Sequence, residues 1–115
     1  MNADTIFDRI LRKELPARIV HEDDTVLAFH DAHPQAPVHV LVIPKKKVAS
    51  LDRLGELSGE EAGRFLQAVA AVARGLGLAD SGYRVVINNG KDANQSVDYL
   101  HAHILGRRHM RWPPG

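Results

Sequence analysis

The chain has 115 residues, with 15 Lys and Arg against 14 Asp and Glu, so its formal net charge is +1 and its length, 1–115, is that of one domain. This balance gives no general attraction to nucleic acid or acidic lipid, and the absence of cysteine excludes disulfides and thiolate–zinc sites. No apolar run has the length of a membrane span or a signal peptide, so we expect a cytoplasmic protein with neither a nucleic-acid nor a membrane partner.

The first part of the chain predicts a short helix followed by strands. Asp4 or Thr5 can cap the helix, and Pro16 can end it. Apolar and β-branched runs then indicate strands over 19–21, 25–29 and 38–43, the first two joined by a hairpin turn. The strand 38–43 is almost wholly apolar, which is typical of burial on both faces. His39 within it therefore needs a hydrogen-bond partner.

Three consecutive lysines, Lys45 to Lys47, follow that strand. They are either the solvated exit of the strand or a diffuse attraction for a phosphate ligand.

The second part predicts a long helix and two further strands. Ser58 and Glu61 form a capping-box pattern at the start of the helix, and Gly75 and Gly77 can end it. Its expected apolar face is broad, with Ala62, Phe65, Leu66, Val69, Ala70, Val72, Ala73 and Leu76. Strands are expected over 83–87 and 99–104. The result is an α+β fold with a five-stranded, mainly antiparallel sheet.

The last predicted strand contains the candidate functional residues. Because side chains alternate in a strand, one face should present three polar rings, from Tyr99, His101 and His103. Strand rise places the two imidazoles roughly 6.5–7 Å apart. The residues before them form a loop rich in amides and hydroxyls, while the opposite face, with Leu100, Ala102 and Ile104, belongs to a core. A polar loop leading into paired imidazoles is typical of an anion site.

The run Tyr99-Leu-His101-Ala-His103-Ile-Leu resembles the signature His-φ-His-φ-His-φ-φ of the histidine triad (HIT) nucleotide-binding proteins, in which φ is apolar. Other segments of that family occur here in the same order: Asp4–Phe7, Ala28–Asp31, Pro34–Pro37, His39–Lys45, Asn94–Val97 and Trp112–Gly115. The terminal Trp-Pro-Pro-Gly is a mark of the branch of purine nucleoside phosphoramidases.

The resemblance implies a HIT-like fold that forms a homodimer. In such a dimer the long helix and a strand edge build the interface, and the two sheets join into one of ten strands. The C-terminal tail, residues 107–115, would reach the active site of the partner and present Trp112 there. A small core and a proline-stiffened tail are consistent with this arrangement.

The resemblance also implies hydrolysis of purine nucleoside 5′-phosphoramidates and related adenylated compounds, with release of AMP or GMP and no cofactor. By position, His101 is the nucleophile that forms a nucleotidyl-histidine, and His103 faces the phosphate and the leaving group. His39 supports the imidazoles, and Ser96 could pass a proton to the departing amine. A neutral imidazole is nucleophilic near pH 7 without a metal.

The implied nucleotide contacts have three parts. Asp31 would accept hydrogen bonds from the ribose hydroxyls. The phosphate would meet Asn88, Asn94, Ser96 and Val97, and the base an apolar slot of Ile6, Phe7, Ile10, Phe29 and Leu41. Four further histidines, His21, His30, His33 and His109, are interpreted as non-catalytic, although His33 lies in the loop beside the expected pocket.

Two positions depart from the family pattern. Tyr99 replaces the first histidine of the signature, and a phenol cannot carry a positive charge near neutrality. Asn94 replaces a residue that is usually glycine in this branch, and asparagine tolerates a positive φ better than most residues.

Other readings remain open at this stage. His39, His101 and His103 could instead bind zinc. The chain could be a low-turnover nucleotide-binding or regulatory protein, or a dinucleoside polyphosphate hydrolase or nucleotidyl transferase of the same superfamily.

Overall fold

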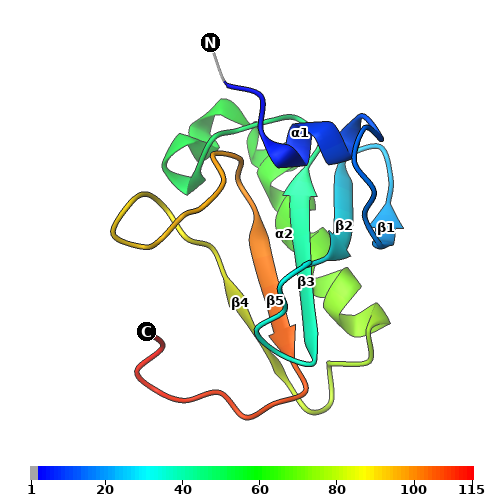
Figure 1. Ribbon diagram of the computed structural model, residues 1–115, viewed down its shortest axis with the longest axis vertical. Helices are drawn as coiled ribbons and strands as arrows, with labels where there is room; N and C mark the ends of the chain where they lie inside the picture. Colours follow the sequence, from blue (N-terminus) through cyan, green and yellow to red (C-terminus); the bar gives the residue numbers. More distant parts are fainter. Residues whose placement is uncertain (1–2) are drawn as a thin grey trace.

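The computed structural model describes residues 3–115 and shows a five-stranded sheet with helices on both faces (Figure 1). The elements in chain order are α1 (Ile6–Leu11), β1 (Ile19–Glu22), β2 (Val26–His30), β3 (Val38–Pro44), the 3-10 helix η1 (Leu51–Glu56), α2 (Gly59–Gly75), β4 (Tyr83–Val86) and β5 (Ala102–Gly106). The strand order is β1-β2-β3-β5-β4, and every neighbouring pair is antiparallel. The predicted α+β class and antiparallel sheet are confirmed. No helix within residues 3–115 combines the length and the apolar character needed to cross a membrane.

Both helices begin at the residues that the capping patterns predict. Thr5 caps α1 in a box with Asp8, and Ser58 caps α2 in a box with Glu61. The end of α1 differs from the prediction, because the helix stops at Leu11 rather than at Pro16. Lys13 adopts a left-handed φ of 63°, which ends the helix by backbone conformation before the proline is reached.

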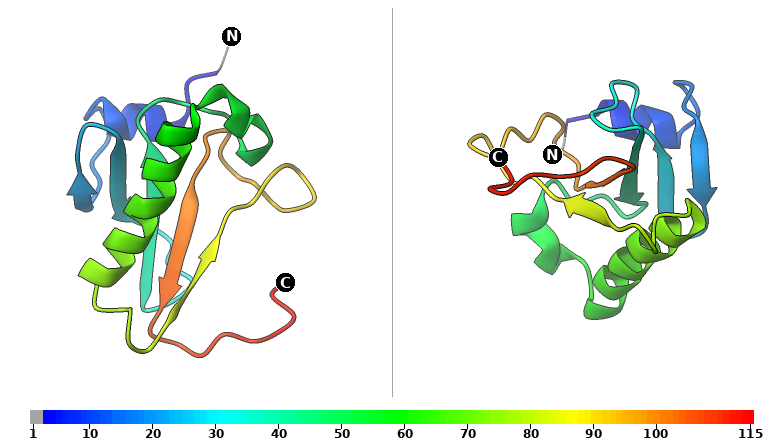
Figure 2. Two further views of the ribbon diagram at one scale, coloured as in Figure 1. Left: turned by 180° about the vertical axis from the view of Figure 1, so that it is seen from behind. Right: turned by 90° about the horizontal axis from the view of Figure 1, so that it is seen from below.

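Helices α1 and α2 lie on opposite faces of the sheet (Figure 2). An apolar core lies under each helix. On one face, α2 packs Phe65, Val69, Val72 and Ala73 against the even-numbered residues of β2 and β3. On the other face, α1 packs Phe7 and Ile10 against the odd-numbered residues Leu27, Phe29, Leu41 and Ile43. The apolar face of α2 is narrower than predicted, because Leu66 and Ala70 are exposed.

The final strand begins later than the alternation predicts, at Ala102 rather than at residue 99, and extends to Gly106. Its pairing with β3 stops at Val42, because β3 ends at Pro44, which has no N–H to donate. The amide of Leu100 instead donates to the carbonyl of Val48. Leu100, Ala102 and Ile104 are nevertheless fully buried, as expected.

The three lysines after β3 are all paired with carboxylates. Lys45 binds Glu22, Lys46 binds Glu61, and Lys47 binds Asp8 at 2.8 Å in a largely buried pair. Lys47 also donates to the carbonyl of Ala3. These contacts connect the exit of β3 to other elements, so the lysines act as structural ties rather than as a free phosphate-attracting cluster.

Candidate active site

A cleft of about 830 Å³ opens on the face of the sheet that carries α1. Helix α1 and the connection from α1 to β1 form one wall, and the segments after β2 and before β5 form the other. The floor is a row of three side chains on adjacent strands, because Phe29 pairs with Leu41 and Leu41 pairs with His103. Strands lie about 4.8 Å apart, so this row extends roughly 10 Å from the apolar end to the imidazole end.

His101 lies at the imidazole end, buried to 3% exposure, with its ring packed edge-on against Phe7 at 5.0 Å. Its Nδ1 is 2.6 Å from the carbonyl oxygen of Tyr99. A carbonyl oxygen only accepts, so Nδ1 carries the proton and donates, and Nε2 keeps its lone pair. Burial lowers the pKa of His101, against the opposing effects of the Tyr99 bond and the charge of Asp31. The ring is therefore neutral and its Nε2 nucleophilic near pH 7.

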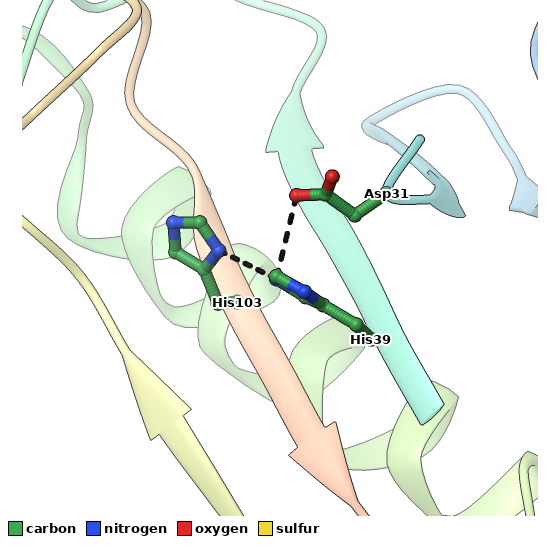
Figure 3. A group of neighbouring side chains, drawn as sticks. All are labelled: Asp31, His39 and His103. Atoms are coloured by element: carbon green, nitrogen blue, oxygen red, sulfur yellow. Dashed lines mark hydrogen bonds and ion pairs between the residues drawn. The ribbon is translucent and has the colours of Figure 1, made fainter. Parts of the chain in front are cut away.

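His39 also has a defined tautomer. The amide of Gln35 donates to its Nδ1 at 3.0 Å, so in the neutral ring Nε2 carries the proton. That Nε2 lies 2.9 Å from Nδ1 of His103 and 3.4 Å from a carboxylate oxygen of Asp31 (Figure 3). Because Nε2 of His39 is the donor, Nδ1 of His103 is the acceptor. Burial lowers the pKa of His39, opposed by the charge of Asp31.

The proton of His103 is consequently on Nε2. This atom is buried and has no hydrogen-bond partner among residues 3–115. Burial, reinforced by the neighbouring His101 and His39, lowers the pKa of His103 to about 4. Its ring centroid lies 4.9 Å from that of His101, closer than the strand rise predicts, because His101 precedes β5. The lone pair of His101 therefore belongs to a ring that lies beside an imidazole with an unused, buried N–H.

Tyr99 does not join these imidazoles. Its hydroxyl donates to the carbonyl of Pro44, and its fully buried ring packs in the core beneath α1. Burial, together with the charge of Asp8, raises the pKa of Tyr99, so the phenol stays neutral. Its contribution to the site is the backbone carbonyl that orients His101.

Comparisons with known proteins agree with this geometry. Residues 12–110 match the HIT domain family. The chain belongs to the HIT family. It is 50% identical to an "Uncharacterized HIT-like protein" of Synechocystis sp. over the full length of both chains. It is also 50% identical to the "14 kDa zinc-binding protein" of Zea mays, over 96% of this chain and 88% of the relative.

A solved HIT-family hydrolase from Legionella pneumophila has the same fold, with a TM-score of 0.91 and 41% identity over 96% of this chain and 98% of that one. The chain is thus a HIT-family, hydrolase-like protein of a family that binds nucleotides.

Most of the residues that the sequence singled out meet at the HIT cleft. They line it as Ile6, Phe7, Ile10, Phe29, Asp31, Leu41, Ser96, Val97, His101 and His103. His39 lies directly behind, bonded to His103.

Three predicted contacts fall outside the described lining: Asn88, Asn94 and Trp112. Asn94 adopts a φ of 61° in an exposed turn, as the usual glycine would. Trp112 is 80% exposed, and its ring lies 5.8 Å from the guanidinium of Arg84.

Sequence reasoning missed part of the wall. The connection Leu15–Arg18 also lines the cleft, as do His30, Ala32 and Pro34 on either side of the predicted Asp31. His33, which is expected beside the pocket, is part of the same lining. The position of these segments directly before β1 and directly after β2 is the signal that the sequence offers. Asp31 is expected to bind the ribose, but one of its carboxylate oxygens lies 3.4 Å from Nε2 of His39. Its other oxygen accepts a hydrogen bond from the amide of His33.

The name of the maize relative raises the question of a metal. Within residues 3–115, the side chains whose ligand atoms gather within 4.8 Å are Asp31, His39 and His103, a different set from the three histidines considered at first. A metal would need the lone pair of His39 Nε2, but the Gln35 amide already uses the lone pair of Nδ1 and leaves the proton on Nε2. The residues as arranged form a hydrogen-bonded chain and do not fit a zinc ion.

Proposed function

We propose that this HIT protein hydrolyses purine nucleoside 5′-phosphoramidates and related adenylated compounds through a nucleotidyl intermediate on His101. The observation that supports this most directly is the lone pair of His101 Nε2, held in the cleft by the bond from Nδ1 to the Tyr99 carbonyl. A nucleophile fixed in one tautomer needs no base to activate it, because it is already deprotonated.

The proposed reaction has two steps. In the first, His101 Nε2 attacks the α-phosphorus, and the bond from phosphorus to the amine breaks. The departing amine takes a proton from Ser96 or from a water molecule. In the second, water attacks phosphorus and the bond from phosphorus to His101 Nε2 breaks. The water gives up one proton, which restores Ser96 or passes to solvent, and AMP or GMP leaves with His101 free again. The N–H of His103 Nε2 would donate to a phosphoryl oxygen where negative charge develops.

The dimensions of the cleft suit a nucleoside monophosphate. The row Phe29–Leu41–His103 separates the apolar end from the imidazoles by roughly 10 Å, which is comparable to the span from a purine ring to its 5′-phosphorus. A base would rest on Phe29 and Leu41 beneath α1. Few polar groups reach this slot, so we expect little discrimination between adenine and guanine.

We further propose that the functional unit is a homodimer and that the tail 107–115 completes the partner's cleft. Strand β4 lies at the edge of the sheet with its outer side unpaired, and Trp112 is largely exposed. An unpaired edge strand is a natural surface for strand addition.

The deciding experiment is the replacement of the nucleophile. His101→Asn should reduce AMP release from adenosine 5′-phosphoramidate by roughly 10³-fold or more. AMP affinity, measured by calorimetry, should change little, because the base and ribose contacts remain. Wild-type protein mixed with labelled substrate and denatured rapidly at alkaline pH should carry covalent nucleotide, and the variant should not.

A substrate panel separates the alternatives. Faster release from a diadenosine polyphosphate than from the phosphoramidate would favour the polyphosphate hydrolase. Tight AMP binding without any trapped nucleotidyl-enzyme would favour the low-turnover binding protein. Undiminished activity of His101→Asn would eliminate the mechanism.

A further inference from the structure

The tautomers of His39 and His103 in the imidazole cluster depend on a backbone group, the amide of Gln35. No side chain of the histidine triad signature supplies this bond. Gln35 lies in the segment between β2 and β3, flanked by Pro34 and Pro37. Its amide donates to His39 Nδ1 at 3.0 Å. Because the donor is a backbone group, the geometry of this bond depends on the contacts that hold the backbone of Gln35 in place.

One side chain from another part of the chain fixes that residue. Arg108, two residues after the end of β5, donates from Nε to the carbonyl oxygen of Gln35 at 3.0 Å. Sheet register brings the two segments together, because Val38 at the start of β3 pairs with Gly106 at the end of β5. The contact therefore connects the exit of the catalytic strand to the loop that precedes the other imidazole strand.

We propose that Arg108 is a positioning residue of the imidazole cluster. The amide and the carbonyl of Gln35 belong to the two peptide groups that meet at its Cα. A bond that holds the carbonyl restricts rotation of the Gln35 backbone and so keeps the amide directed at His39 Nδ1. His39 then donates from Nε2 to His103, and His103 keeps its proton on Nε2, the buried nitrogen that has no partner among residues 3–115. Without the Arg108 contact, His39 can carry its proton on either nitrogen, and His103 loses its defined donor. The effect on turnover rests on the proposed function, whereas the effect on the tautomer does not.

The neighbouring residue provides a matched control. Arg107 is also exposed, and its guanidinium also donates to a backbone carbonyl, that of Leu76 at 3.3 Å. Leu76 follows α2 and is remote from the imidazoles in the hydrogen-bond network. Arg108→Met and Arg107→Met each remove one guanidinium of the same kind, while Arg108→Lys keeps a donor for the Gln35 carbonyl.

The first measurement is the nitrogen-15 spectrum of the histidine side chains in the full-length protein near neutral pH. Wild type, Arg107→Met and Arg108→Lys should show His39 with a bare Nδ1 and a protonated Nε2. Arg108→Met should show the two nitrogens of His39 shifted toward each other, as exchange between tautomers requires. An unchanged His39 spectrum in Arg108→Met would overturn the proposal, as would the same shift in Arg107→Met.

The second measurement is steady-state kinetics with adenosine 5′-phosphoramidate. Arg108→Met should lower kcat roughly five- to tenfold, the size expected for one hydrogen bond, and leave KM nearly unchanged. Arg108→Lys should recover most of that loss. A rise in KM with unchanged kcat would contradict the positioning role. If wild type itself releases no AMP, the proposed function fails, and the His39 spectra alone decide the role of Arg108.

Discussion

At the scale of single residues, backbone carbonyls and amides determine what the imidazoles can do. The Tyr99 carbonyl fixes His101, and the Gln35 amide fixes His39. In each bond the partner of the imidazole is a backbone group, so the side chains of Tyr99 and Gln35 take no part in it. This explains how the first position of the signature can be tyrosine without breaking the cluster, since the phenol is directed to Pro44 instead.

Removal of the Tyr99 hydroxyl tests this explanation. Tyr99→Phe should lower the free energy of unfolding by about 1–2 kcal/mol, because a buried carbonyl loses its donor. Both kcat and KM should stay at wild-type values, because the carbonyl that orients His101 is retained. Urea denaturation and steady-state kinetics measure the two effects, and the half-exposed Tyr83→Phe is the control that should change neither. A large loss of kcat in Tyr99→Phe would show that the phenol tunes the imidazoles.

The pH dependence of turnover should reflect the buried imidazoles. Burial holds the pKa of His101 below its usual 6.5, and the pKa of His103 falls to about 4. Protonation of His101 Nε2 removes the nucleophile, so activity falls as pH decreases through the folded-state pKa. We expect kcat/KM to stay level from about pH 8 to below pH 6.5 and to decline only in more acidic buffer. Rates of His101→Asn, subtracted at each pH, correct for acid hydrolysis of the substrate, and an acid limb centred at or above pH 6.5 would contradict this expectation.

At the scale of elements, the short helix α1 shapes both the apolar slot and the surroundings of His101. It supplies Phe7, which packs on Phe29 and on His101, so it covers both the apolar slot and the nucleophile. A helix of this length is not stable alone. Its capping box and the buried ion pair between Asp8 and Lys47 hold it against the sheet.

Loss of this cap should therefore affect nucleotide binding. Thr5→Ala should cost about 1 kcal/mol of stability and raise KM several-fold with kcat nearly constant, because α1 would cover the base slot less often. Ser58→Ala removes the equivalent cap of α2, which packs on the opposite face of the sheet. It should cost a similar amount of stability without changing KM, as measured by denaturation and kinetics. Equal KM values in the two variants would disprove the link between the cap and the slot.

At the scale of the whole molecule, the two edges of the sheet differ. Strand β1 forms one edge and β4 the other. Exposed apolar side chains occur at both, with Ile19 at 44% on β1 and Val85 at 39% on β4. The tail leaves β5 on the β4 side, where Arg84 binds the carbonyl of Arg111 (Figure 1). The proposed dimer uses this edge.

A charge placed on each edge distinguishes them. Val85→Lys should convert the dimer to a monomer in sedimentation experiments and lower kcat/KM, because a lysine on an edge strand opposes strand pairing and the partner's tail is lost. Ile19→Lys should remain dimeric and active. A wild-type protein that sediments as a monomer, or a dimer that survives Val85→Lys, would refute the proposed arrangement.

Local patterns in the sequence predict most of the helices and strands. Local signals were sufficient for the helix starts at Thr5 and Ser58 and for the apolar strand before Pro44, because caps and periodicity act over a few residues. The ordered motifs predict that His39, His101 and His103 lie in one cluster, and their rings are neighbours in the structure. The start of β5 was wrong by three residues, because strand pairing depends on where the partner strand ends.

The position of the proton on each imidazole follows from contacts that form when the chain folds. That depends on the Tyr99 carbonyl, the Gln35 amide and the Arg108 contact, groups that sequence patterns do not reveal since every residue has a similar backbone. The contact from Arg108 to Gln35 joins segments far apart in the chain, and the contact from Gln35 to His39 depends on the fold of the loop before β3. The histidines of the sequence therefore indicate the kind of chemistry, whereas the packing of the folded chain decides which ring nitrogen keeps the lone pair and which keeps the unused N–H.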